Sequence, residues 1–346
     1  MKKSLITLAV LAAAGAASAQ SSVTLYGRVD AGLVSAKDQI GGDGVTRTKL
    51  DSNVLNNSLW GFKGTEDLGN GLKANFVLEA GMNMDDGTAT TYTVNGSDAK
   101  VTGFNRKATV GLSGNFGAVE LGRNYTAYDS LRGATNNTAD TNMAVTNDVW
   151  KVGGDYAVRT DNSVRFDSAN YSGFSGAVAY AFGENKNAAT NLNNGATDTV
   201  SLHVKYANGP LLVGYAHQTE EQKRSATTPF AVPSSTKYNL IAGSYDFGVA
   251  KLNAGYNKVT GSAARGDDTE YQVGVSAPFG ATTVYFGYAN GKNEIGAVET
   301  KRAGFDLAAT YALSKRTTAY AGYKTYEVKD TKIENTVYGV GVRHVF

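Results

Sequence analysis

Many charged side chains of this 346-residue chain lie on one side of an alternation with a period of two residues. Side chains of these types could transfer protons, bind metal ions or attract dissolved ions. The acids and bases are scattered rather than paired at short spacing, so no carboxylate pair for glycoside hydrolysis can be assigned. The charges that share one side of the alternation are Arg28, Asp30, Lys63, Lys73, Glu79, Lys205, Lys251, Glu270, Arg302, Asp306 and Arg343.

Other reactive groups do not form a catalytic pattern. The chain has no Cys, which excludes thiolate nucleophiles, Cys-ligated zinc and disulfides. His203, His217 and His344 lie far apart in sequence, and only His203 is expected to face inward. Neither a Gly-x-Ser-x-Gly motif nor a Walker lysine loop is present. We therefore expect no enzymatic activity and no cofactor, with Ca²⁺ bound by acidic loops as the open alternative.

The first 19 residues are typical of a cleaved secretory signal. Lys2 and Lys3 precede an apolar stretch at 5–14, and small residues follow up to Ala19. The alternative is a membrane anchor, but the apolar stretch is shorter than the roughly 20 residues that a spanning helix requires. Removing two cations from a chain with 33 Lys plus Arg and 31 Asp plus Glu leaves a neutral protein. Neutrality argues against binding to nucleic acid.

After this segment, apolar and polar residues alternate with a period of two, which is typical of half-buried strands. No segment longer than two turns has a convincing helical pattern, so we predict a nearly all-β protein. The alternation predicts sixteen strands, at 23–37, 55–66, 71–82, 104–113, 116–125, 163–171, 175–183, 198–208, 211–222, 236–246, 249–260, 268–277, 281–291, 299–313, 316–329 and 335–346.

The connections between these strands alternate in length. Tight turns such as Gly114-Asn115 are followed by long polar segments such as 38–54, 83–103 and 184–197. Short turns at one rim and long loops at the other describe an outer-membrane barrel, because only a closed sheet leaves no unpaired amide in lipid. We predict a 16-stranded antiparallel transmembrane β-barrel over residues 20–346, with short periplasmic turns and long external loops. The alternative is a soluble propeller or sandwich.

The charged side of the strands indicates what the barrel encloses. Charges that face inward stay hydrated only if the interior holds water, and sixteen strands are wide enough to leave an aqueous channel. Residues 126–162 form the longest segment without clear periodicity, and loops of this length are usually functional or disordered. We predict that this third loop folds into the lumen, narrows it and opposes its charges to those of the wall. The alternative is a mobile external loop. The charged residues of the loop are Asp129, Asp140, Asp148, Asp155, Asp161, Arg132, Lys151 and Arg159.

Several motifs resemble one family. They are Ser22-Val23-Thr24-Leu25-Tyr26-Gly27, the run from Trp60 to Ala74, Leu121-Gly122-Arg123-Asn124-Tyr125, and a final strand with Tyr338, Val340 and Val342 before Phe346. Over the whole chain after the signal, these residues resemble the trimeric Gram-negative porins, particularly the general porins of β-proteobacteria. The resemblance implies a homotrimer in a lipid bilayer with lipopolysaccharide, and a final strand that the outer-membrane assembly machinery reads.

The resemblance also implies a constriction where basic wall residues face acids of the loop 126–162. Alternation itself places Arg28, Lys63 and Arg165 inward. Arg123 shares its parity with outward apolar neighbours, so its inward placement depends on the resemblance. Many relatives carry Arg where this chain has Leu59, and enteric relatives carry an acid where it has Lys151. Because rings of charge bias selectivity, we expect a weak preference for anions.

Passive diffusion of small hydrophilic solutes and anions is the function that these features favour. A substrate-specific porin for organic acids or sugars is the nearest alternative, although sugar channels usually have an aromatic track and few aromatic residues apart from Tyr26 and Tyr285 are expected to face inward. A non-channel outer-membrane adhesin is the other alternative.

Overall fold

The computed structural model describes residues 22–40, 43–90, 92–94, 97–99, 103–136, 142–150, 154–183, 197–222, 234–331 and 333–346. The predicted signal 1–19 and the loop residues Asp140 and Lys151 lie outside these ranges. Within them, the structure contains no helix with the length and apolar character needed to span a membrane.

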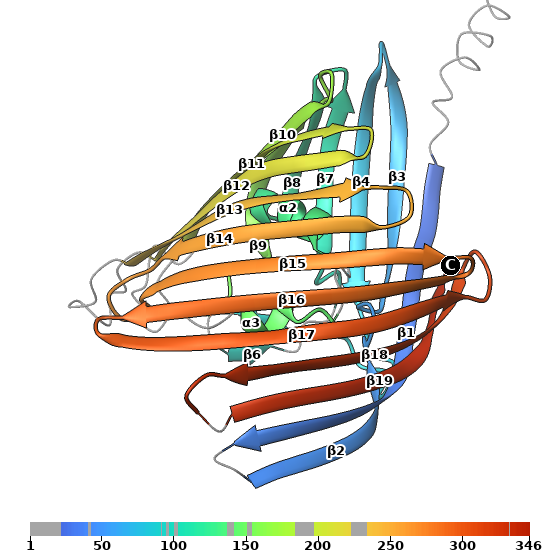
Figure 1. Cartoon of the computed structure of the whole chain (residues 1–346). Coiled ribbons are helices and arrows are strands. Elements are labelled where there is room, and N and C mark those ends of the chain that lie inside the picture. The colour runs from blue at the N-terminus through green and yellow to red at the C-terminus, as the bar shows by residue number, and fades with distance from the viewer. Residues whose placement is uncertain are drawn as a thin grey trace, which may run out of the picture.

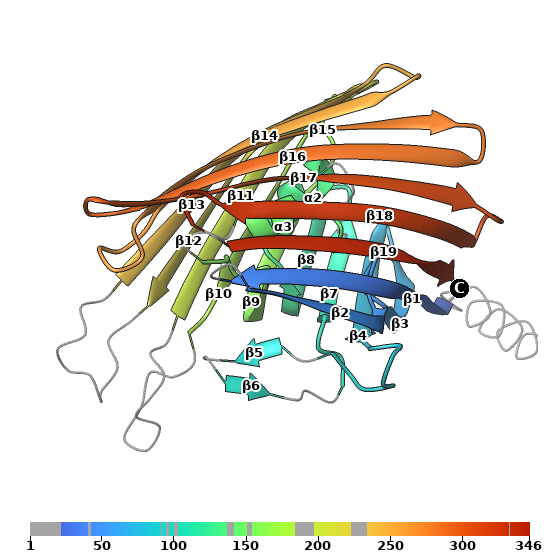
Figure 2. The same ribbon diagram turned by 60° about the horizontal axis from the view of Figure 1, so that its bottom comes forward.

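The main body is one antiparallel sheet of tilted strands that surrounds two short helices (Figures 1 and 2). A separate two-stranded hairpin, β5 (Tyr92–Val94) and β6 (Ser97–Ala99), lies in the connection between β4 and β7. The strands of the main sheet are β1 (Ser22–Ile40), β2 (Asp43–Ser52), β3 (Leu59–Gly69), β4 (Leu72–Gly81), β7 (Lys107–Gly114), β8 (Gly117–Tyr125), β9 (Arg159–Ser168), β10 (Phe174–Ala181), β11 (Thr197–Asn208), β12 (Leu211–Gln222), β13 (Ser234–Asp246), β14 (Lys251–Thr260), β15 (Asp267–Phe279), β16 (Thr282–Ile295), β17 (Val298–Ala312), β18 (Thr317–Val328) and β19 (Ile333–Val345).

The sheet contains 17 strand segments but only sixteen barrel positions, because β2 and β3 share one edge of β1. Residues 31–40 of β1 pair with β2, and residues 22–28 of β1 pair with β3. Residues 53–58 connect β2 to β3 and leave the sheet. The other edge of β1 pairs with β19, which closes the barrel. At this seam the backbones of Gly27 and Phe346 exchange two hydrogen bonds of 3.0 Å. The predicted 16-stranded antiparallel barrel is confirmed.

One predicted loop is wrong. Residues 38–54 were expected to be a long polar loop, but residues 38–40 form the end of β1 and residues 43–52 form the whole of β2. The two sides of β2 are both polar, with Arg47 and Lys49 on one side and Thr46 and Thr48 on the other. The strand β2 pairs with β1 through its backbone hydrogen bonds. Its sequence lacks the hydrophobic alternation that predicts strands, so the strand was not predicted.

The two sides of each strand differ as the alternation predicts. On β1, Val23, Leu25 and Leu33 are exposed on the outer surface, whereas Asp30 and Val34 are buried on the inner side. On β19, the outward residues are Tyr338, Val340 and Val342, and the terminal Phe346 is also exposed. The outer surface of the barrel is therefore apolar, as contact with lipid requires.

The segment after β8 folds inside the barrel and contains helices α2 (Ala127–Thr135) and α3 (Thr146–Val149) (Figure 1). Thr126 is the N-cap of α2, since its hydroxyl accepts a hydrogen bond from the backbone N–H of Asp129. Helix α2 contacts β10 to β14, and α3 contacts β16 and β17. No helix was expected here, because α2 is short and its pattern is weak. The N-cap threonine followed by an acid in the first turn was the available signal.

Candidate functional site

The inner face of β10 to β18 is covered by the third loop, and we call it the covered wall. Its contact with the loop is apolar and aromatic. Tyr128 and Leu131 of α2 are buried against strand residues such as Leu240. Val149 of α3 and Trp150, its C-cap, belong to the same buried cluster. The Tyr128 hydroxyl also donates to Asn257 Oδ1 at 2.9 Å. These contacts fix the helices against the barrel.

A second cluster fixes the loop near residues 142–143. Met143 is buried against Val34, Val54 and Tyr320. Beneath this cluster, the carboxylate of Asp30 is fully buried and accepts hydrogen bonds from the backbone N–H groups of residues 54, 55 and 56 at 2.9–3.2 Å. The Tyr320 hydroxyl donates to the same carboxylate at 2.8 Å. Asp30 therefore fastens the segment that separates β2 from β3.

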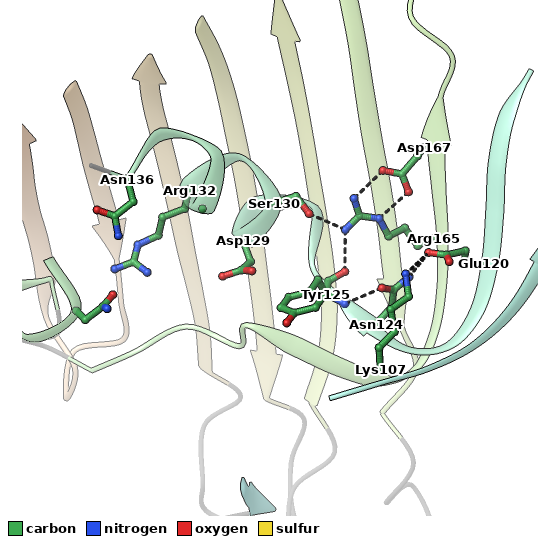
Figure 3. Close-up of a pocket in the computed structure, with 12 residues that line it drawn as sticks. Lys107, Glu120, Asn124, Tyr125, Asp129, Ser130, Arg132, Asn136, Arg165 and Asp167 are labelled. Atoms are coloured by element: carbon green, nitrogen blue, oxygen red, sulfur yellow. Dashed lines mark hydrogen bonds and ion pairs between the residues drawn. The ribbon is translucent and has the colours of Figure 1, made fainter. Parts of the chain in front are cut away.

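The opposite side of the lumen is formed by β3, β4, β7, β8, β9 and residues 22–28 of β1, and we call it the open wall. A cavity of about 410 Å³ lies between this wall and α2 (Figure 3). Three cations and three acids line it, so its net formal charge is zero. The lining residues are Lys107, Glu120, Asn124, Tyr125, Asp129, Ser130, Arg132, Gly133, Asn136, Asn147, Arg165 and Asp167.

Arg165 joins the open wall to the start of α2. Its guanidinium forms a fork with both carboxylate oxygens of Asp167, at 2.6 and 2.7 Å. The remaining Nη1 donates to the backbone carbonyls of Tyr125 and Thr126 and to Ser130 Oγ, at 2.9–3.1 Å (Figure 3). Bidentate pairing of this kind holds a guanidinium in one orientation. Arg165 is thus both a charge at the cavity and a tie for the loop.

The other cations at the cavity are also held in pairs or stacks. Lys107 Nζ lies 2.9 Å from Glu120 on the neighbouring strand. Across the cavity, Arg132 donates to the Tyr156 hydroxyl at 3.2 Å, and that hydroxyl donates to Asp129 at 2.5 Å. Burial raises the pKa of Tyr156 well above its usual value, so the hydroxyl keeps its proton and remains a donor. Charges therefore face one another from the loop and from the wall.

A connected row of six side chains crosses the open wall, and we call it the tyrosine row. It consists of Lys63, Tyr26, Glu79, Arg106, Tyr125 and Arg159, on or next to neighbouring strands. Lys63 Nζ lies over the Tyr26 ring, 5.2 Å from its centroid, and the Tyr26 hydroxyl donates to Glu79 at 3.2 Å. Glu79 pairs with Arg106 at 2.7 Å. The row ends where the Tyr125 oxygen accepts hydrogen bonds from Arg106 and Arg159, at 2.8 and 2.6 Å.

The predicted wall cations are distributed over several places. Arg165 lines the cavity and Lys63 belongs to the tyrosine row. Arg28 donates to the backbone carbonyl of Asn57 at 2.7 Å. Arg123 donates to the carbonyl of Asn105 and pairs with Asp161, both at 2.6 Å, and it does not line the cavity. A β-bulge between residues 122 and 124 interrupts the alternation at this point.

The predicted loop charges are also separated from one another. Asp129 faces the cavity, and Arg159 belongs to the tyrosine row. Asp148 accepts from Lys324 Nζ of the covered wall at 2.6 Å. The Asp155 carboxylate accepts from the backbone N–H of the next residue.

Some inward charges are not hydrated, contrary to expectation. Asp30, Glu270 and Asp306 are at most 2% exposed. Asp306 accepts a hydrogen bond from the backbone N–H of Val145 at 2.9 Å, so the loop replaces water around it. The alternation predicted the direction of these side chains correctly, but it could not show that a segment distant in sequence covers them.

The most informative contacts of the site were not predicted from the sequence. Lys107 and Glu120 are not opposite each other in the pairing of β7 with β8, where Glu120 faces Gly111, so their contact depends on this register and on the reach of the lysine side chain. Arg106 lies just before β7, and Tyr125 is the last residue of β8. The backbone near both residues is irregular, so the alternation does not predict which way their side chains point. In the motif Leu121-Gly122-Arg123-Asn124-Tyr125, the arginine was predicted to be a wall residue of the constriction. The tyrosine of this motif makes the contacts in the tyrosine row.

The described parts of the chain contain no group of three or more His, Asp or Glu side chains that could hold a metal ion. His203 faces inward as expected, and its Nδ1 lies 2.7 Å from the carbonyl oxygen of Ala127 beneath α2. The described histidines therefore have structural contacts.

Known proteins resemble this chain over its whole length. The Gram-negative porin family model matches residues 6–331. Outer membrane porin protein 32 of Delftia acidovorans is 35% identical, and an outer membrane porin protein of Bordetella pertussis is 31% identical, each with 100% of both chains covered. An anion-selective porin from Comamonas acidovorans has a similar solved structure, with a TM-score of 0.77 and 28% identity over 94% of this chain and 100% of that one. OmpT of Vibrio cholerae, in a trimer form, shares the fold at a TM-score of 0.66 and 17% identity over 94% and 99% of the two chains. The chain belongs to the Gram-negative porin family and is an outer-membrane β-barrel rather than an enzyme.

Proposed function

We propose that this porin is a water-filled channel for passive diffusion of small hydrophilic solutes and ions, with a weak preference for anions. The observation that carries the proposal is the cavity of about 410 Å³ between α2 and the open wall. The loop is fixed to the covered wall by two apolar clusters, and this leaves polar and charged residues around the remaining space. Residues 126–162 are then the constriction.

Two observations support the anion preference. The tyrosine row carries three cations and one acid, so this part of the open wall has a net positive charge. The likeness to an anion-selective porin from Comamonas acidovorans, at 28% identity, agrees with this sign. The cavity itself has balanced charges, which is why we propose a weak preference rather than a strong one.

The remaining parts of the proposal concern export and assembly. We assign residues 1–19 as a cleaved signal and the strand with Tyr338, Val340, Val342 and Phe346 as the segment that the assembly machinery reads. In the bilayer, with lipopolysaccharide around it, the barrel forms a homotrimer. The apolar outer surface of β1 and β19 supports contact with lipid or with another copy of the chain.

Conductance of the purified protein in a planar lipid bilayer tests the channel, and the reversal potential under a salt gradient tests its selectivity. We expect stepwise ohmic insertions, often in threes, and a reversal potential of the anion-selective sign. A folded protein that gives no conductance would overturn the channel. A cation-selective sign would overturn only the anion preference.

A further inference from the structure

The tyrosine row holds more positive than negative charge. Lys63, Arg106 and Arg159 are its cations, and Glu79 is its single carboxylate. Across the ranges that the structure describes, no carboxylate lies within ion-pair distance of Lys63 or Arg159. Two cations are therefore held by something other than an acid.

Tyrosines supply that contact. The Tyr26 ring lies beneath Lys63 Nζ, and the Tyr125 ring lies 4.2 Å from Arg159 Cζ. The face of an aromatic ring attracts a cation through its quadrupole, without a formal charge. The Tyr125 oxygen also accepts hydrogen bonds from two guanidinium groups at once. A neutral phenol can accept both, because its oxygen has two lone pairs.

The chemical difference from the cavity is clear. At the cavity, Lys107 and Arg165 are each held by a carboxylate, so their positions are fixed and their charges are cancelled. In the tyrosine row, Arg106 is paired with Glu79, whereas Lys63 and Arg159 are held by tyrosines and their charges remain. A long cationic side chain without any partner would keep its charge but would be spread over many rotamers.

We propose that Tyr26 and Tyr125 are positioning residues for anion passage: they hold Lys63 and Arg159 against the open wall without cancelling their charge. The ligand class is small hydrated anions, which meet the row as they pass. This inference rests on the proposed function, because it assigns a role in selectivity within that channel.

Tyr125→Phe tests the proposal, since it keeps the ring and every formal charge and removes only the shared acceptor. We expect the anion-to-cation permeability ratio, obtained from the reversal potential, to fall about twofold. Tyr26→Leu, which removes the ring beneath Lys63, should shift the ratio in the same direction. Tyr285→Phe is the matched control. Its hydroxyl has no hydrogen-bond partner among the described residues, so the ratio should stay at the wild-type value. Heat-modifiable migration on gels establishes that each variant is folded.

Arg159→Gln, measured in the same series, separates this proposal from the proposed function. If Arg159→Gln lowers the ratio and neither tyrosine variant does, the charges act without being positioned, and the tyrosine proposal is overturned while the anion preference stands. If none of the three variants changes the ratio, the tyrosine row does not sort ions and the tyrosine proposal fails, while the sign of the wild-type reversal potential still decides the anion preference. If the wild type prefers cations, the proposed preference is wrong, and the tyrosine proposal still requires a further shift toward cations in Tyr125→Phe.

Discussion

The covered wall and the open wall belong to one sheet and share one rule of alternation, yet they hold different chemistry. On the covered wall, Tyr128, Leu131 and Leu240 pack without contact with water, and Asp306 is buried by the loop. On the open wall, Lys107, Arg106 and Glu79 form networks that border the cavity or the lumen. Alternation decides that a side chain points inward. The path of the third loop then decides whether that side chain is buried or borders the lumen.

This difference predicts separate effects for the two walls. Damage to the covered wall should release the loop and change the size of the channel. Damage to the open wall should change which ions pass and leave the size nearly constant. Three experiments test this separation, and a first one tests how Asp30 stabilises the barrel that carries both walls.

Asp30→Ala should have the largest effect, because it leaves three backbone N–H groups of residues 54–56 without their acceptor. Each unsatisfied buried group costs about 1 kcal/mol or more, so the free energy of unfolding should fall by about 3 kcal/mol. Urea titration of tryptophan fluorescence in lipid vesicles measures it. The matched control is Asp161→Ala, which breaks the half-exposed pair with Arg123 and should cost less than about 1 kcal/mol. Equal losses in the two variants would contradict the role assigned to Asp30.

Leu131→Asp should release α2 from the covered wall. Leu131 is completely buried, and burying an unpaired carboxylate costs several kcal/mol, so the helix should leave its site. Single-channel conductance should then rise about twofold, since sixteen strands leave a wide channel when nothing fills it. Leu131→Met keeps the volume and the apolar character, and it should conduct like the wild type. An unchanged conductance in folded Leu131→Asp would show that α2 does not limit the channel.

Arg165→Lys changes a residue that contacts both the open wall and the loop, so it could affect the size of the channel as well as its ion selectivity. The substitution keeps the charge but loses the fork on Asp167 and the contacts with the start of α2. We expect the conductance to rise by roughly a third and the reversal potential to change little, since a lysine still supplies the charge. Arg316→Lys, in a tight turn at the rim, is the control and should change neither quantity. A large change in reversal potential would mean that geometry outweighs charge at this position.

Salt should produce the smallest change. Raising the ionic strength from 0.1 to 1 M shortens the Debye length from about 10 to about 3 Å, so the permeability ratio should move toward one. The ratio of conductances between Leu131→Asp and the wild type should not depend on salt, because it reports size. If both quantities follow the salt concentration together, the two walls do not have separate roles.

Much of the fold could be predicted from the sequence, because each strand carries its own evidence. Alternating apolar residues, such as Val23 and Leu25 on β1, indicate which side of each strand faces lipid. Tight turns such as Gly114-Asn115 indicate which strands pair. β2 was missed because neither of its sides is apolar. Helix α2 was missed because nine residues provide too little periodicity.

The site was predictable only in part, since its contacts join residues that are distant in sequence. Parity gave the direction of Lys63 and Arg165, but it gave no partner for either. Which acid meets Lys107 depends on strand register, and the partners of Tyr125 depend on the backbone at strand ends. The burial of Asp30 by residues 54–56 required knowledge of where the chain leaves the sheet. Asp140 and Lys151 remain predictions.

The seam between β1 and β19 has a consequence for the order of assembly. Most strand pairs join neighbours along the chain and can form early, whereas Asp30 and Tyr320 are 290 residues apart. Contacts of such long sequence separation form slowly, because the intervening chain must first be ordered. Until they form, the sheet has two unpaired edges that can bind strands of other molecules. The hydrogen bond from Tyr320 to Asp30 joins strands from the two ends of the chain, so it requires the sheet to close and it stabilises the closed barrel.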